Sequence, residues 1–191
     1  MLSIKSKLSS LTLNFFSWKV KNSPPITSKY VLIAAPHTSN WDFLLMLLTS
    51  YKTNVPLKWM GKKSLFKWPF SSLMIALGGV PINRDKRGSV VSVTATKIMN
   101  ASKFVLVVPP EGTRSKTEFW KSGFLYIARE SKIPIVFSYL DYKKKEIGFS
   151  APINQTLHSK KIIEIADTFY KNVTGLYPEN FGPIKFKEKN Y

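Results

Sequence analysis

The fold is decided by residues 31–48, which read VLIAAPHTSNWDFLLMLL. An apolar run ends at Pro36, and a second apolar block begins at Phe43. The first run is typical of a buried strand and the second of a buried helix, so the segment predicts a strand–turn–helix unit. His37 then lies at the carboxyl end of a strand, which is where open α/β sheets place their ligands.

The predicted turn holds a histidine and an aspartate five residues apart, His37 and Asp42. A carboxylate can hold an imidazole ring and stabilise its charged form, so the two residues can act as a general base and its orienting partner. On a regular helix this spacing leaves side chains roughly 140° apart, so the pair requires His37 to precede the helix and lean over its first turn. Two structural alternatives stay open: Asp42 can complete a capping box with Ser39, and His37 can be a hydrogen-bonded loop residue.

Arginines follow two further predicted strands. Residues 104–108 form a second buried-strand pattern and continue into PPEGTRS, which carries Gly112, Thr113 and Arg114. Glycine lets the backbone approach a ligand closely, and the planar arginine side chain matches a phosphate with two hydrogen bonds. A short apolar strand before Arg84 adds a second arginine. One histidine and two arginines at strand ends suggest hydroxyl chemistry beside a phosphate.

Four sequence blocks come in one order: His37-x4-Asp42, Gly79-x4-Arg84, Glu111-Gly112-Thr113-Arg114 and Ile133-Pro134-Ile135-Val136. In this order and at these spacings the chain resembles the 1-acyl-sn-glycerol-3-phosphate acyltransferase family of glycerolipid acyltransferases. The resemblance extends from position 36 to about position 136. It implies an O-acyltransferase with a largely parallel or mixed sheet and a surface channel that opens towards a membrane.

The resemblance also implies a role for each matching residue. His37 matches the base that deprotonates the acceptor hydroxyl, and Asp42 matches the residue that orients and charge-stabilises that base. Residues that hold the acceptor's phosphate or shape its pocket are matched by Arg84, Glu111, Gly112, Thr113, Arg114 and Lys62.

Two positions depart from the family's pattern. Ser64 stands where many relatives carry a glutamate close after the lysine that matches Lys62. Pro36 stands where many relatives carry an asparagine before the histidine.

The implied reaction moves a fatty acyl group from acyl-CoA or acyl carrier protein to the free hydroxyl of a lysophospholipid, 1-acyl-glycerol-3-phosphate, giving phosphatidic acid. His37 takes the hydroxyl proton, and backbone N–H groups from Thr38 to Asn40 are expected to stabilise the oxyanion. No covalent acyl-enzyme is needed, which suits a chain without cysteine and without a G-x-S-x-G motif. No metal is expected, and no cofactor beyond the acyl donor. The alternative acceptors are glycerol-3-phosphate and other lysolipids.

The length and composition of the chain limit which folds and functions are possible. At 191 residues the chain makes one domain with a sizeable core. Its longest apolar stretch, residues 43–48, is far shorter than the ~20 residues that span a bilayer. The lack of cysteine excludes disulfides and thiolate metal sites and fits a cytoplasmic location.

The net charge of +18 indicates a polyanionic partner: an anionic membrane surface, an acidic acyl carrier or CoA, or nucleic acid. No recognition motif for nucleic acid accompanies the aromatic residues, so no specific nucleic acid is expected. A lysine-rich proteome is the alternative source of the charge. The lysine run 143–145 is interpreted as a solvated turn between two strands.

Apolar side chains recur at helical spacing at Ile4, Leu8, Leu11, Phe15 and Trp18, with lysines beside them. This pattern predicts an interfacial helix in the headgroup layer, and the alternative is a helix that packs on its own domain. The protein is then expected to be peripherally bound to the inner face of the cell membrane. A non-catalytic basic membrane-binding module is the remote alternative, because it leaves the histidine–aspartate pair unexplained.

The expected organisation has three parts: an amphipathic helix at 1–22, an acyltransferase domain at 23–175 and a loosely held basic tail at 176–191. Alternating strand and helix patterns predict an α/β fold whose largely parallel or mixed sheet is covered on both faces. An apolar-faced helix or surface segment is expected at 67–77, helices at 89–100, 119–131 and 159–172, and strands at 133–140 and 147–151. His158 is expected to be a capping or surface residue.

Overall fold

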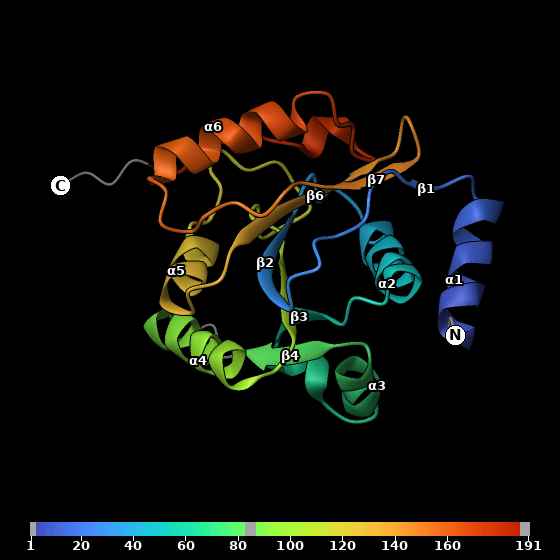
Figure 1. Cartoon of the computed structure of the whole chain (residues 1–191), viewed down its shortest axis with the longest axis horizontal. Helices are drawn as coiled ribbons and strands as arrows, with labels where there is room; N and C mark the ends of the chain where they lie inside the picture. The colour runs from blue at the N-terminus through green and yellow to red at the C-terminus, as the bar shows by residue number, and fades with distance from the viewer. Residues whose placement is uncertain (1–2, 83–86, 188–191) are drawn as a thin grey trace.

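A mixed sheet of seven strands forms the centre of the computed structural model, which describes residues 3–82 and 87–187 (Figure 1). The strand order is β1-β7-β6-β2-β5-β3-β4. Strands β6, β2, β5, β3 and β4 are parallel, β7 is antiparallel to β6, and β1 is parallel to β7. The strands are β1 (Lys19–Val20), β2 (Lys29–Ala34), β3 (Leu57–Lys62), β4 (Gly79–Ile82), β5 (Phe104–Val108), β6 (Ile135–Asp141) and β7 (Glu146–Phe149).

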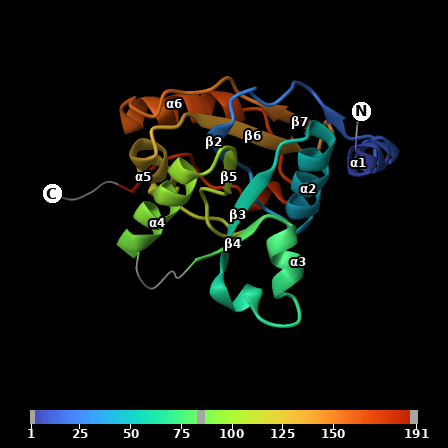
Figure 2. The same ribbon diagram turned by 60° about the horizontal axis from the view of Figure 1, so that its bottom comes forward.

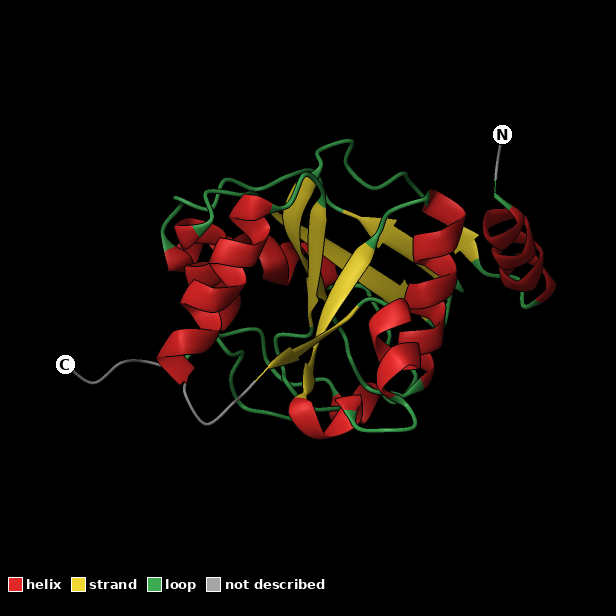
Figure 3. Ribbon diagram, turned by 90° about the horizontal axis from the view of Figure 1, so that it is seen from below, coloured by secondary structure: helices red, strands yellow, loops and turns green. Residues whose placement is uncertain are grey.

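Helices cover both faces of this sheet (Figures 1 and 3). Helix α2 lies on one face with α1 outside it, and α4, α5 and α6 cover the other face. Helix α3 lies beside β3 and β4 (Figure 2). The helices are α1 (Ile4–Phe15), α2 (Trp41–Thr53), α3 (Ser71–Ala76), α4 (Arg87–Asn100), α5 (Gly123–Glu130) and α6 (Ser159–Tyr170), with 3-10 turns η1 (Lys63–Phe66) and η2 (Pro178–Asn180). The predicted α/β fold is confirmed.

Strand β2 lies at the centre of the sheet and buries both of its faces. Val31 and Ile33 belong to the core cluster under α5 and α6, whereas Tyr30 and Leu32 belong to the cluster under α2. This alternation is the period of two that a strand imposes, and it explains the near-continuous apolar run. Because Ile33 is paired with Val108, the carboxyl ends of β2 and β5 lie side by side. The turns that follow the two strands therefore meet at one edge of the sheet.

Two predicted helices are shorter than expected, and one observed strand was not predicted. Helix α3 is shorter than expected, because the residue before Pro69 is biased away from helical backbone. Helix α5 begins only at Gly123, since Trp120 forms a strand-like bridge with Phe186. Strand β3 was not expected, and its apolar pattern is diluted by Lys58 and Lys62.

The prediction of a loosely held tail is wrong for the described part of the C-terminal segment. Phe181, Ile184 and Phe186 pack against the main core cluster. The backbone N–H of Trp120 donates to the carbonyl of Lys185 at 2.8 Å. The segment thus extends the core up to residue 187, and its last residues lie outside the described part of the chain.

Lysines 143–145 are exposed in the turn between β6 and β7, so the interpretation of this run as a solvated turn is confirmed. The Nζ atom of Lys144 lies 3.2 Å from a carboxylate oxygen of Asp141, and that of Lys145 donates to the carbonyl of Phe16 at 3.1 Å. The β6–β7 hairpin is therefore tied to the end of α1. His158 caps α6 as expected, since its side chain accepts from the backbone N–H of Lys160.

Helix α1 packs on α2 with a narrow face of small and apolar residues. Ser6, Ser9 and Leu13 are buried there. The predicted stripe of Ile4, Leu8, Leu11 and Phe15 points outward, with exposed fractions of 85, 63, 67 and 81%. Trp18 departs from the prediction, because it is buried in the core cluster under α2. Within the described residues no helix has the length and apolarity needed to cross a bilayer.

Candidate active site

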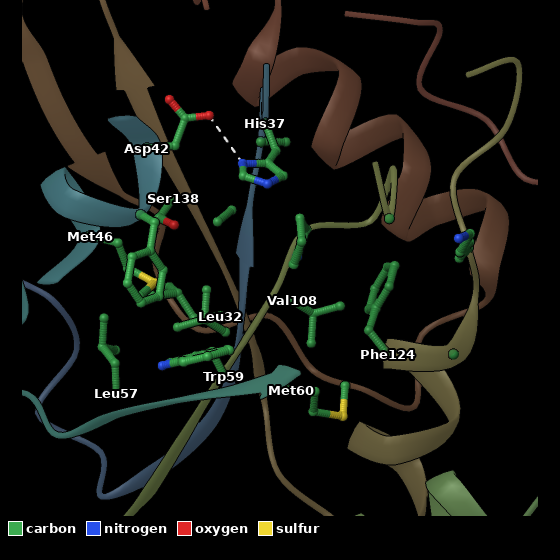
Figure 4. Close-up of a pocket in the computed structure, with 18 of the residues that line it drawn as sticks. Leu32, His37, Asp42, Met46, Leu57, Trp59, Met60, Val108, Phe124 and Ser138 are labelled. Carbon is green, nitrogen blue, oxygen red and sulfur yellow. Dashed lines mark hydrogen bonds and ion pairs between the residues drawn. The ribbon is translucent and has the colours of Figure 1, made fainter. Parts of the chain in front are cut away.

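The turn after β2 brings the predicted pair together. His37 Nδ1 lies 3.0 Å from Asp42 Oδ2 (Figure 4). Helix α2 begins at Trp41, so His37 precedes it and leans over its first turn, as the spacing required. The same carboxylate oxygen accepts the backbone N–H groups of Thr38 and Ser39, each at 3.0 Å. Asp42 therefore does both things: it caps the backbone at the start of α2 and it holds the His37 ring.

This geometry assigns the two nitrogens of the His37 ring. A carboxylate only accepts hydrogen bonds, so in the neutral ring this contact places the proton on Nδ1 and the lone pair on Nε2. His37 lines a cavity, and its side chain is 19% exposed. A neutral imidazole whose free nitrogen faces a cavity can act as a general base.

The expectation that backbone N–H groups of the turn stabilise an oxyanion is wrong at two of its positions. The N–H groups of Thr38 and Ser39 donate to Asp42. These two N–H groups therefore stabilise the negative charge of the Asp42 carboxylate, at the positive end of the α2 dipole. The N–H of His37 is also engaged, since it donates to Glu111 Oε1 at 3.1 Å.

Tyr142 joins the site from the β6–β7 hairpin. Its hydroxyl donates to Asp42 Oδ1 at 2.6 Å. Burial, followed by the hydrogen bond to Asp42, raises the pKa of Tyr142 well above its usual value. The sequence analysis missed this residue, because a contact between positions 100 residues apart leaves no local pattern.

Glu111 lies behind the turn and outside the cavity lining. It is 2% exposed, and its Oε1 atom holds the backbone of His37. Burial raises the pKa of Glu111 to about 7, against the lowering effect of its backbone hydrogen bonds. Its Oε2 atom has no partner among the described residues. Through this contact Glu111 joins the turn after β5 to the turn after β2.

The cavity at His37 has a volume of about 1230 Å³ and gathers most of the other predicted residues. Lys62, Gly112, Thr113 and Arg114 line it. Arg84 lies outside the described residues. The sequence analysis missed Lys121, which also lines the cavity. We call the exposed cations Lys62, Arg114 and Lys121 the cationic rim.

Gly112 allows this rim to form. Its φ angle of +68° is one that glycine adopts without strain. A Cβ atom placed there would collide with the side chain of Lys121. The backbone N–H of Lys121 donates to the carbonyl of Pro110 at 2.8 Å, which fixes the lysine beside the turn. A glycine at this position therefore brings a cation close to the backbone of residues 110–114.

Most of the remaining wall of the cavity is apolar (Figure 4). One group of side chains lies between α2 and the sheet: Leu32, Met46, Leu57, Trp59 and Val107. A second group lies towards α4 and α5: Met60, Val91, Val108, Phe124 and Ile127. We call these two groups together the apolar wall. The cavity thus offers a base, a cationic rim and apolar space for a chain-like ligand.

A histidine held by a carboxylate beside a cavity has the chemistry to accept a proton from a hydroxyl group. The family model described as Acyltransferase matches residues 17–139, which is more than half of the chain. The chain therefore belongs to the Acyltransferase family, and the predicted enzyme class is confirmed.

A solved structure shares the fold. The chain is similar to the crystal structure of the 1-acyl-sn-glycerophosphate (LPA) acyltransferase PlsC from Thermotoga maritima, with a TM-score of 0.62 and 18% sequence identity. The likeness covers 90% of this chain and 80% of that one. No curated protein sequence is significantly similar to the chain.

Proposed function

We propose that this acyltransferase moves a fatty acyl group from acyl-CoA or acyl carrier protein to the free hydroxyl of 1-acyl-glycerol-3-phosphate, giving phosphatidic acid. The observation that carries the proposal is the His37–Asp42 pair, 3.0 Å apart, in a cavity with a cationic rim and an apolar wall. A lysophosphatidate presents a hydroxyl, a phosphate and an acyl chain, and each part finds a complementary group. The printed description of the Thermotoga maritima relative as an LPA acyltransferase supports the same acceptor.

The proposed chemistry needs one base and one activated donor. His37 Nε2 takes the hydroxyl proton as the acceptor oxygen forms a bond to the thioester carbonyl carbon. The carbon–sulfur bond then breaks, and the proton on His37 passes to the departing thiolate. Asp42 stabilises the charged ring between these two steps. General base catalysis of this kind is worth roughly 10²- to 10⁴-fold in rate.

The cationic rim is proposed to bind the phosphate of the acceptor. Arg114 offers two parallel N–H donors to a phosphate, and Lys62 and Lys121 add positive charge. Gly112 and Thr113 shape this pocket, and the Thr113 hydroxyl accepts the backbone N–H of Ser115 at 3.3 Å, whereas Glu111 holds the turn after β2. Arg84 remains a proposed phosphate ligand through the family resemblance alone.

The apolar wall is proposed to hold acyl chains. Leu32 and Leu57 are at most 9% exposed and line the cavity together with the half-buried Met46 and Trp59, so the space between α2 and the sheet offers an apolar surface. An acyl chain gains about 0.8 kcal/mol for each methylene buried there. Chain length is therefore expected to be selected by the side chains under α2.

The proposed partner surface is an anionic membrane at the inner face of the cell membrane. Helix α1 presents four apolar side chains outward, with Lys5 and Lys7 on the same helix. Exposed apolar side chains also mark the η1–α3 segment: Leu65, Trp68, Phe70, Leu73 and Ile75. An interfacial helix inserts such side chains among headgroups, and lysines add attraction to anionic lipids.

The test is an acyl-transfer assay on anionic vesicles that contain 1-acyl-glycerol-3-phosphate, with labelled acyl-CoA or acyl carrier protein as donor. Labelled phosphatidic acid is the expected product. Parallel reactions with glycerol-3-phosphate and with lysophospholipids that lack a phosphate monoester define the acceptor. Transfer to one of these and not to 1-acyl-glycerol-3-phosphate would reassign the acceptor. Absence of product with every acceptor and both donors would overturn the proposal.

A further inference from the structure

The Asp42 carboxylate uses its two oxygens differently. Oδ2 receives three hydrogen bonds from the turn itself, from His37 Nδ1 and from the N–H groups of Thr38 and Ser39. Oδ1 receives the hydroxyl of Tyr142, which comes from a hairpin 100 residues away. We propose that Tyr142 is a positioning residue that fixes the Asp42 carboxylate and, through it, the His37 ring; this inference rests on the proposed acyl transfer.

A second anchor is needed because a carboxylate rotates easily. The last torsion of an aspartate is broad and roughly two-fold, so bonds to Oδ2 alone leave the plane of the carboxylate free to tilt. A 2.6 Å O–H···O bond to Oδ1 is short, as charge-assisted bonds are, and it sets that plane. The position of His37 Nδ1, and hence of Nε2, follows from it.

Tyr142 is itself held on three sides. Its backbone N–H donates to the carbonyl of Thr174 at 2.9 Å, in the segment after α6. Its ring meets the buried Trp18 ring edge to face, with 5.0 Å between the centroids. Next to it, buried Asp141 accepts the backbone N–H groups of Lys143 and Lys144, both at 3.1 Å, and closes the hairpin turn. The hydroxyl therefore reaches Asp42 from a rigid support.

The surroundings keep this hydroxyl a donor. Burial raises the pKa of Tyr142, and the charges of Asp42 and Tyr177 raise this pKa further. Glu111 and His37 face Asp42 from the other side of the turn. Because Tyr142 stays protonated at working pH, its bond draws negative charge from Asp42. Removing the hydroxyl leaves more of that charge facing the His37 ring.

The experiment replaces Tyr142 by phenylalanine, which keeps the ring against Trp18 and removes only the hydroxyl. We expect kcat for acyl transfer to fall about tenfold, with KM for donor and acceptor unchanged, because the lost bond is one to a charged group. The acidic limb of the kcat/KM profile is expected to move to higher pH, and the Nδ1–H resonance of His37 to shift or broaden. Tyr51→Phe is the matched control: it alters a tyrosine on the same helix as Asp42, about 13 Å further along, and should change none of these readouts.

The outcomes separate this inference from the proposed function. If the wild type transfers acyl groups and Tyr142→Phe keeps the wild-type kcat, pH profile and His37 resonance, the positioning role is refuted. If the wild type transfers nothing, the proposed function fails. The His37 resonance then decides the inference alone: a change in Tyr142→Phe and not in Tyr51→Phe supports it, and no change overturns it.

Discussion

The turn between β2 and α2 and the N-terminal helix α1 both reverse the usual distribution of polar and apolar groups, but in opposite senses. In the turn, Thr38, Ser39 and Asp42 are buried at 6% exposure or less. In α1, apolar side chains are exposed while Ser6 and Ser9 are buried against α2. Most soluble proteins do the opposite in both respects.

The difference lies in where each region finds its partners. The buried turn satisfies its polar groups internally, because Asp42 accepts four hydrogen bonds from Tyr142, His37, Thr38 and Ser39. The apolar stripe of α1 is exposed in the described structure, and its proposed partner is the membrane surface. Changes in the turn should therefore alter chemistry, and changes in α1 should alter only the encounter with lipid.

The largest effect is expected from Asp42→Asn, which keeps the shape of the side chain and removes its charge. The amide no longer selects the Nδ1–H form of the ring and no longer stabilises the charged ring. We expect kcat to fall about 10²- to 10⁴-fold, with little change in acceptor KM. Steady-state kinetics with a saturating donor measure this. A kcat within threefold of the wild type would show that the turn is only a helix cap.

The next largest effect concerns α1. Replacing Leu8 and Leu11 by serine removes two side chains that are proposed to insert into lipid, so binding to anionic vesicles should weaken roughly 30- to 100-fold. Turnover of a short-chain, water-soluble acceptor should stay the same. Serines at Val93 and Met99, two exposed apolar positions of α4, form the matched control. If both double variants lost the same affinity for vesicles, the exposed stripe of α1 would have no special role in lipid binding.

A smaller effect is expected at the cationic rim. Arg114→Ala removes a charged side chain that is proposed to bind the acceptor's phosphate, and acceptor KM should rise about 10- to 30-fold at nearly constant kcat. Arg129 binds the carbonyls of Gln155 and Leu157 away from the cavity, and Arg129→Lys serves as the control. An unchanged KM in Arg114→Ala would remove this arginine from phosphate binding.

The smallest effect on turnover is expected from Glu111→Gln, whose main consequence is for stability. Burial raises the pKa of Glu111 to about 7 from 4.5, so the folded state holds this proton more tightly than the unfolded state. The resulting stability is fully present below pH 4.5 and is lost as the pH rises to about 7, and it amounts to about 3 kcal/mol. Urea unfolding at pH 5 and pH 8 measures it. The unfolding free energy of Glu111→Gln should change less between pH 5 and pH 8 than that of the wild type. An equal change in the two proteins would contradict the raised pKa of Glu111.

Local patterns were sufficient to predict the central fold and the dyad. The strand–turn–helix unit follows from one apolar run, one proline and a second apolar block. The dyad could be predicted because His37 and Asp42 are five residues apart and the helix geometry left only one arrangement that joins them. Thr113 and Arg114 could be expected near them because parallel strands end at one edge of the sheet, whereas Lys62 was predicted from the family resemblance.

Long-range contacts could not be predicted in the same way. Tyr142 reaches Asp42 from a distant hairpin, and Glu111 turns from the predicted phosphate pocket towards the backbone of His37. Trp18 fits the periodic stripe of α1 in sequence, but the chain turns after Phe15 and buries the ring beside Tyr142. Each case depends on tertiary packing that periodicity does not encode.

The central claim is that His37 is the base for acyl transfer. The direct test compares phosphatidic acid formation by the wild type, His37→Ala and His158→Ala, on anionic vesicles with 1-acyl-glycerol-3-phosphate and labelled acyl-CoA or acyl carrier protein. His158 caps α6 and is the chain's other histidine, which makes it the matched control. The account predicts product from the wild type and from His158→Ala, and a loss of at least about 10²-fold in His37→Ala while that variant keeps its folded circular dichroism spectrum. Near-normal turnover by folded His37→Ala would contradict it.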